Sequence, residues 1–158
     1  MSRLKFLKNE ALSFIERDCP WQAIARWDEA VDIRIYGETP QSLEHEKVYD
    51  MKAQACIQLH EWEPAIESAL KALQIRPNWW CAHQTLGRAY LGFGHLEAAV
   101  KSFSRAVHIS PETEELWTED LIWAADLLQR EKSGNCEWKP VNEPEVNDSE
   151  EEIQDAQE

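Results

Sequence analysis

The sequence predicts an all-α protein, an α-solenoid of three helix pairs that is followed by a capping helix and an acidic tail. Apolar residues recur at helical spacing through most of residues 4–132. Small residues and prolines also recur thirty-four residues apart, as Pro77 with Pro111 and Ala65 with Ala99. A period of this length is typical of helix pairs that bury a continuous core only when they stack.

The most regular copy of the repeat spans residues 80–113. Gly87 and Ala99 are small, which lets the two helices of a pair cross closely. Tyr90 and Phe103 are large and fill the space around that crossing. The signature residues of this copy, in order, are Leu86, Gly87, Tyr90, Ala99, Phe103, Ala106 and Pro111.

Two weaker copies precede it, at residues 46–79 and 4–37, with an eight-residue insertion at 38–45. We expect Asp18 to cap the second helix of the first pair and the insertion to lengthen the helix that follows it; a loop before a shorter helix is the alternative. The expected helices cover about 2–17, 20–35, 40–59, 62–75, 79–91 and 96–109.

A last helix at 112–132 carries many acidic residues, which we expect to face solvent and cap the open end of the stack. Residues 133–158 hold nine acidic residues and one lysine, together with Pro140 and Pro144. This composition predicts disorder. We therefore divide the chain into a repeat domain, 1–132, and a disordered acidic tail, 133–158.

The signature residues resemble those of the tetratricopeptide repeat family over residues 4–113. A narrower resemblance, to one group of small proteins within that family, covers about 7–132. It is carried by the stretches 27–30, 84–89, 106–109 and 117–121. The resemblance implies a non-enzymatic adaptor that binds a peptide or a partner helix in a concave groove, as part of a larger complex.

The family's groove is lined by the first helix of each repeat. Here those positions form a cationic strip of Lys5, Lys8, Lys47 and Arg88 beside an apolar floor. The alternative is a solvated face without a ligand. The groove residues that the resemblance implies are Lys5, Lys8, Leu12, Ile15, Lys47, Asp50, Gln54, Ile57, Gln84, Arg88 and Leu91.

Members of the family that bind heat-shock chaperones hold a C-terminal carboxylate with a clamp of Lys, Asn, Asn, Lys and Arg. A carboxylate needs several converging charge-assisted donors. Only Lys8 supplies one at the matching positions, so we do not expect a heat-shock co-chaperone of this type. The five matching positions are Lys8, Leu12, Met51, Cys81 and Thr85.

Eight tryptophans are many for 158 residues. Trp27 has a core position, but Trp21, Trp80, Trp117 and Trp123 are candidate anchors for a partner if they are exposed. Two alternatives follow from them. One is a half-tetratricopeptide-like scaffold subunit of an RNA-processing assembly, and the other is self-association, although we expect a monomer.

No pattern in the chain predicts an enzyme. The four cysteines and five histidines lack metal-ligand spacing, and there is no phosphate loop or nucleophile with a base, so we expect no catalytic residue, no cofactor and no metal. The alternative is a regulatory or catalytic subunit with a site that the sequence does not reveal.

The expected partners are proteins. A net charge of −14 without a basic stripe argues against direct nucleic-acid binding. No run of eighteen apolar residues or secretory core occurs, so we expect no membrane partner and an intracellular protein, in cytoplasm or nucleus.

Ser149 is a candidate phosphorylation site. Three glutamates follow it, as in acidic phosphoacceptor sites of the casein kinase 2 type. Phosphorylation would add about −1.5 to −2 charge. We also expect the tail to compete for the strip of Lys5, Lys8, Lys47 and Arg88, because the charges are opposite.

Overall fold

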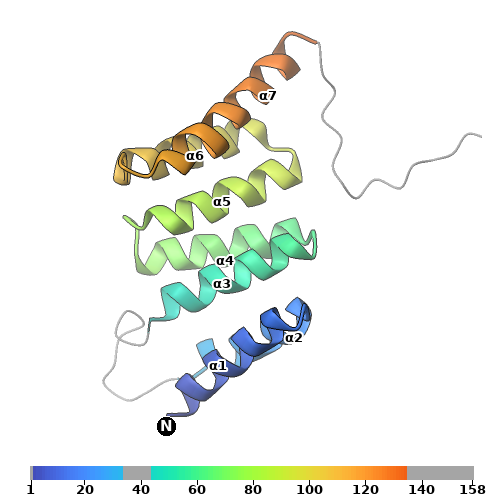
Figure 1. Cartoon of the computed structure of the whole chain (residues 1–158), viewed down its shortest axis with the longest axis vertical. Helices are drawn as coiled ribbons and strands as arrows, with labels where there is room; N and C mark the ends of the chain where they lie inside the picture. The colour runs from blue at the N-terminus through green and yellow to red at the C-terminus, as the bar shows by residue number, and fades with distance from the viewer. Residues whose placement is uncertain (1, 34–43, 135–158) are drawn as a thin grey trace, which may run out of the picture.

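A computed structural model describes residues 2–33 and 44–134, which form helices and no strand. Three helix pairs stack one after another, and a capping segment ends the stack (Figure 1). The predicted all-α solenoid is thereby confirmed. Its elements are α1 (Arg3–Glu16), α2 (Pro20–Val31), α3 (His45–Gln58), α4 (Trp62–Ile75), α5 (Trp80–Phe93), α6 (Leu96–Ile109), η1 (Leu116–Leu121) and α7 (Ile122–Lys132).

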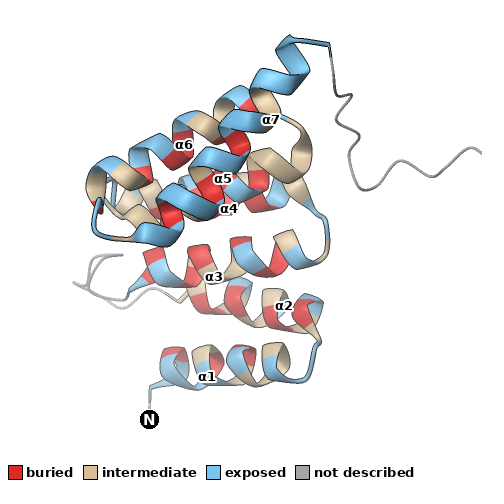
Figure 2. Cartoon of the chain, turned by 45° about the horizontal axis from the view of Figure 1, so that its top comes forward, coloured by how far each residue is buried: buried red, intermediate tan, exposed pale blue. Residues whose placement is uncertain are grey.

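The core is a chain of local contacts along this stack. Each helix packs on those next to it in sequence, and α3 also packs on α5. Buried residues form a stripe on each helix that faces its neighbours (Figure 2). Most of the fully buried side chains are alanines, while Trp27 and Phe103 are the largest. Small residues let the backbones approach closely, and the two large rings fill the space that remains.

Within the third helix pair, the backbone of α5 passes close to a side chain of α6 at Gly87. A Cβ atom placed on Gly87 would stand 2.5 Å from Cε1 of Phe103, well inside van der Waals contact. Phe103 itself is fully buried with Ala99, and Tyr90 packs against the same cluster. The predicted roles of Gly87 and Phe103 at the helix crossing are therefore confirmed.

The turn inside each helix pair uses one residue in the left-handed backbone region. These residues are Asp18 (φ 57°), His60 (φ 58°) and Gly94 (φ 92°), which stand at equivalent positions of the three repeats. The expectation that Asp18 caps α2 is wrong, because Cys19 takes the cap position and its side chain makes no capping bond. Asp18 reverses the chain instead, a conformation that aspartate tolerates better than most residues.

Two helices are shorter than predicted. Helix α2 ends at Val31 rather than near residue 35, and α3 begins at His45 rather than near residue 40. Glu44 has left-handed torsions, φ 55° and ψ 33°, which an α-helix cannot continue through. The alternative of a shorter helix is thus correct. Most of the insertion, residues 38–43, lies outside the described residues.

The capping segment is not the single α-helix predicted for 112–132. It consists of the π-helical turn η1, with wider i→i+5 bonding, and then α7. Its buried positions are Leu116, Asp120 and Ala124, four residues apart. The expectation that the acidic residues of this segment all face solvent is wrong for Asp120.

Within the described ranges, no helix has the length and apolarity to cross a membrane. Residues 135–158, including Cys136, Trp138 and Ser149, lie outside those ranges. The division into a repeat domain and a disordered tail therefore stays a prediction, as does phosphorylation of Ser149.

We predict that Gly87→Ala destabilises the protein. Alanine favours a helix over glycine by about 1 kcal/mol, but overpacking a core costs about 1–3 kcal/mol, and the fully buried Phe103 ring has no room to move away. The net loss in the free energy of unfolding is then about 1 kcal/mol, measured by urea denaturation.

The control is the double variant Gly87→Ala/Phe103→Leu, in which the smaller side chain removes the overlap. The second substitution should then cost less stability in the Gly87→Ala background than in the wild-type chain. A Gly87→Ala variant as stable as the wild type would contradict this account of the crossing.

Candidate functional site

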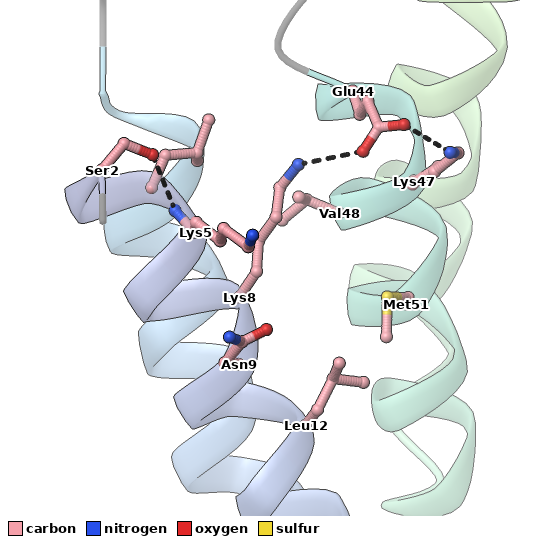
Figure 3. A pocket seen from close by; sticks show the side chains of 10 residues that line it. Ser2, Lys5, Lys8, Asn9, Leu12, Glu44, Lys47, Val48 and Met51 are labelled. Carbon is pink, nitrogen blue, oxygen red and sulfur yellow. Dashed lines mark hydrogen bonds and ion pairs between the residues drawn. The ribbon is translucent and has the colours of Figure 1, made fainter.

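A groove opens between α1 and α3, the first helices of the first two pairs. Helix α3 packs closely on α5, but α1 and α3 do not pack closely on each other. The resulting groove has a volume of about 450 Å³ (Figure 3). Its lining residues are Ser2, Leu4, Lys5, Lys8, Asn9, Leu12, Glu44, Lys47, Val48 and Met51.

Four of the predicted groove residues come together here: Lys5, Lys8, Leu12 and Lys47. The three from α1 are spaced three and four residues apart and so share one face of that helix. Leu12 points into the groove opposite Met51 (Figure 3) and is 40% exposed. The apolar side chains of Leu12 and Met51 thus lie beside lysine ammonium groups from both α1 and α3.

The charged groups of the groove meet at Glu44. Its carboxylate accepts from Nζ of Lys47 at 2.5 Å and lies 3.6 Å from Nζ of Lys8. The hydrogen bond from Lys47, followed by the charges of Lys47 and Lys8, lowers the pKa of Glu44 below its usual range. Lys5 has no ion pair among the described residues. Three lysines around one glutamate leave the groove with an excess of positive charge.

The second repeat contributes Asp50 and Gln54 away from this groove. Nε2 of Gln54 donates to Oδ2 of Asp50 at 2.9 Å, while Oδ1 has no partner among the described residues. Asp50 is buried, and this burial raises the pKa of its carboxyl. Gln54 and one oxygen of Asp50 are thus engaged with each other, and the other oxygen of Asp50 is buried.

The third repeat is closed by the capping segment. Asp120 of η1 is only 8% exposed. Its carboxylate accepts from Nε2 of Gln84 at 2.6 Å and from Nε of Arg88 at 3.1 Å. Nη2 of Arg88 also donates to Glu115 at 3.2 Å. Gln84 and Arg88, both predicted groove residues, are therefore engaged within the chain and do not line the α1–α3 groove.

The remaining predicted groove residues are Ile15, Ile57 and Leu91, which are half-buried and pack against core clusters. The apolar floor of the groove is formed instead by Leu4, Leu12, Val48 and Met51. Binding of a partner by any of the eleven predicted residues stays a prediction.

Glu44 and Asp120 are not among the site residues predicted from the sequence. Nothing in the periodic pattern marks Glu44, since it lies in the insertion between repeats. A signal did exist for Asp120, because it stands midway between Leu116 and Ala124 at helical spacing. A carboxylate on an apolar face requires a cationic partner, and Arg88 is that partner.

Two of the described cysteines, Cys56 and Cys81, are poor candidates for a reactive site. Burial raises the pKa of Cys56 to about 11, and burial also raises the pKa of Cys81. A thiol with a raised pKa carries little thiolate and is a poor nucleophile. The described residues also contain no cluster of three or more metal-ligating side chains.

The tryptophans separate into core and surface positions. Trp27 is buried, whereas Trp21, Trp117 and Trp123 are 62%, 51% and 54% exposed. Trp80 is half-buried. Trp117 and Trp123 both lie on the capping segment, together with Ile122, which is 50% exposed.

Comparisons with known proteins agree with this architecture. Residues 82–113 match the family model described as a tetratricopeptide repeat. A human protein, tetratricopeptide repeat protein 33, is 41% identical over 128 residues, which are 81% of this chain and 46% of the human protein. The chain thus spans about half the length of this relative.

Solved structures show the same fold. The first such domain of the human RPAP3 protein superposes with a TM-score of 0.71 at 18% identity, covering 82% of this chain and 95% of that one. The first domain of Spaghetti, bound to the Hsp90 peptide SRMEEVD, gives a TM-score of 0.70 at 19% identity, covering 80% and 94%.

Proposed function

This chain is a tetratricopeptide-repeat protein, and on that premise we propose that it is a non-enzymatic adaptor whose α1–α3 groove binds a protein partner. The ligand is an extended peptide or a helix that carries acidic side chains next to an apolar one. One observation supports this most directly: the groove joins exposed Leu12 and the Met51 side chain to three lysine ammonium groups.

The charges favour an acidic ligand for a physical reason. The whole chain carries −14, whereas the lining of this groove holds three lysines and one glutamate. Each charge-assisted hydrogen bond from a lysine contributes about 1.5–3 kcal/mol, less where salt screens it. Lys47 and Lys8 already face Glu44, so a ligand carboxylate either shares them or displaces Glu44, whereas Lys5 has no such competitor among the described residues.

A heat-shock peptide does not fit this groove well. Leu12 and Met51 supply no donor where the clamp needs one, and the hydroxyl of Thr85 donates to the Cys81 carbonyl at 3.0 Å. Lys8 is therefore the one strong donor of the five clamp positions. We infer that the chain is not a carboxylate-clamp co-chaperone, although a similar domain does bind an Hsp90 peptide.

Membership of a larger complex is favoured by the capping segment. Its exposed Trp117, Ile122 and Trp123 offer apolar surface away from the α1–α3 groove. Aromatic anchors of this kind often dominate the binding energy of an interface. A scaffold subunit of an RNA-processing assembly is the alternative that this surface favours. The place of action that we propose is intracellular.

We predict that Lys5→Glu/Leu12→Asp weakens peptide binding. Peptides are first selected from a display library on the intact protein, and their affinities are then measured by fluorescence anisotropy. The double variant should weaken the selected acidic peptides by about tenfold or more, because it replaces one attraction with repulsion and removes apolar contact.

The matched control is Arg17→Glu, which makes the same charge reversal on an exposed residue just beyond α1 and outside the groove. Its affinity should stay within about twofold of wild type at physiological salt. An equal loss of affinity in both variants would show that the binding site is not the α1–α3 groove. Wild-type affinity of the selected peptides for the double variant would show the same.

We predict that the C-terminal carboxylate of the Hsp90 peptide SRMEEVD adds little to the affinity of this peptide for the protein. The free-acid and amidated peptides should bind within about twofold of each other, because converging donors are missing. Calorimetric titration of the intact protein measures both. A free acid that binds more than about tenfold tighter would show that the site does hold a terminal carboxylate.

A further inference from the structure

A second groove lies between α4 and α6, the second helices of neighbouring pairs. It has a volume of about 760 Å³. Apolar side chains from α4 and α5 contribute to its lining, among them Leu70, Leu73 and Tyr90. Leu70 is 41% exposed, so part of this apolar lining is open to solvent.

Cationic side chains from α6 stand beside these apolar residues. Lys101 and Arg105 lie one helical turn apart, and His108 follows. Neither Lys101 nor Arg105 forms an ion pair with a described residue. Arg105 also lies near His83, since burial first and then the Arg105 charge lower the pKa of that imidazole.

The lining of this groove is unusual for this chain because it contains no acidic side chain. None of its lining residues is an aspartate or glutamate, although the chain carries thirty acidic residues. The neighbouring Glu67 of α4 and Glu97 of α6 already pair with Lys71 at 2.6 Å and Lys132 at 3.0 Å. The positive charge of Lys101 and Arg105 is thus left for a ligand.

The path of the chain brings an acidic segment to this groove. The Lys132–Glu97 ion pair fixes the end of α7 beside the start of α6. A shallow hollow at Gly94–Ala98, which Glu131 also lines, meets the groove at Ala98. Lys132, two residues before the last described residue, therefore lies beside the start of α6, where this hollow leads to the groove.

We propose that residues 135–152 of this chain bind in the α4–α6 groove. The segment carries seven acidic residues, interspersed with Trp138, Val141 and Val146. Its carboxylates pair with Lys101 and Arg105, and its apolar side chains cover Leu70 and Leu73. Helix α6 is about 21 Å long, and eighteen extended residues reach about 60 Å, so the segment spans the groove easily.

This site differs from the one that the sequence predicts for the acidic tail. The strip of Lys5, Lys8, Lys47 and Arg88 is engaged by Glu44, Glu115 and Asp120 within the chain, apart from Lys5. Lys101 and Arg105 have no such competitor among the described residues, and they lie nearer to the point where the segment starts. The segment shields the α4–α6 groove from other acidic ligands.

Carbodiimide coupling of the intact protein at low salt tests the proposal, because it joins a lysine amine to a carboxylate that touches it. Mass spectrometry of the digest should show Lys101 linked to acidic residues of 137–152. The yield should not change on about tenfold dilution, since the link forms within one chain. The Lys132–Glu97 link is the internal positive control.

Three variants sharpen this test. Arg105→Glu should lower the yield of the Lys101 links by about fivefold or more, whereas Lys5→Glu, at the other end of the stack, should leave it unchanged. Arg105→Lys retains the charge and should add a second link at position 105.

Three results would overturn the proposal. The first is an absence of Lys101 links to residues 137–152 while the Lys132–Glu97 link forms, and the second is an unchanged yield of the Lys101 links in Arg105→Glu. A yield that falls with dilution would assign the groove to the acidic segment of a second copy. Since Arg105 is exposed, a circular dichroism spectrum like that of the wild type is expected for its variants.

Discussion

The carboxylate of Asp120 holds the capping segment against the third helix pair. It is almost fully buried, and it accepts hydrogen bonds from both Gln84 and Arg88. Removing one partner of such a contact leaves an uncompensated polar group, which costs up to about 3–5 kcal/mol when both charges are buried. Here the cost is smaller, because the Arg88 side chain is 44% exposed.

This contact also decides where the protein can bind. By engaging Arg88 and Gln84, η1 covers part of the α5 face that a longer stack would present to a ligand. The open groove is left between α1 and α3, where the two helices do not pack closely. The buried carboxylate of Asp120 therefore holds the capping segment in place and also keeps Gln84 and Arg88 from a ligand, which leaves the proposed site between α1 and α3.

The helices that the sequence predicts best are those bounded by strong local signals. Helices α4 and α6 begin and end at the predicted residues, since a clear apolar period and a turn at each end define them. The start of α3 and the π-helical turn depend on backbone torsions and tertiary contacts, for which the local pattern has no signal. The residues of the site show the same difference between local signals and tertiary contacts. Repeat positions identified Lys5, Lys8, Leu12 and Lys47, but the pairing of Arg88 with a residue thirty-two positions away is visible only in the folded chain.

Hydrogen exchange of the intact Asp120→Asn variant tests this account most directly. Asparagine keeps the size of the side chain but removes the charge that Arg88 faces. The account predicts that amides of η1 and α7 exchange about tenfold faster or more, while those of α3 and α4 keep their wild-type rates. Unchanged protection in η1, or an equal loss of protection in every helix, would contradict it.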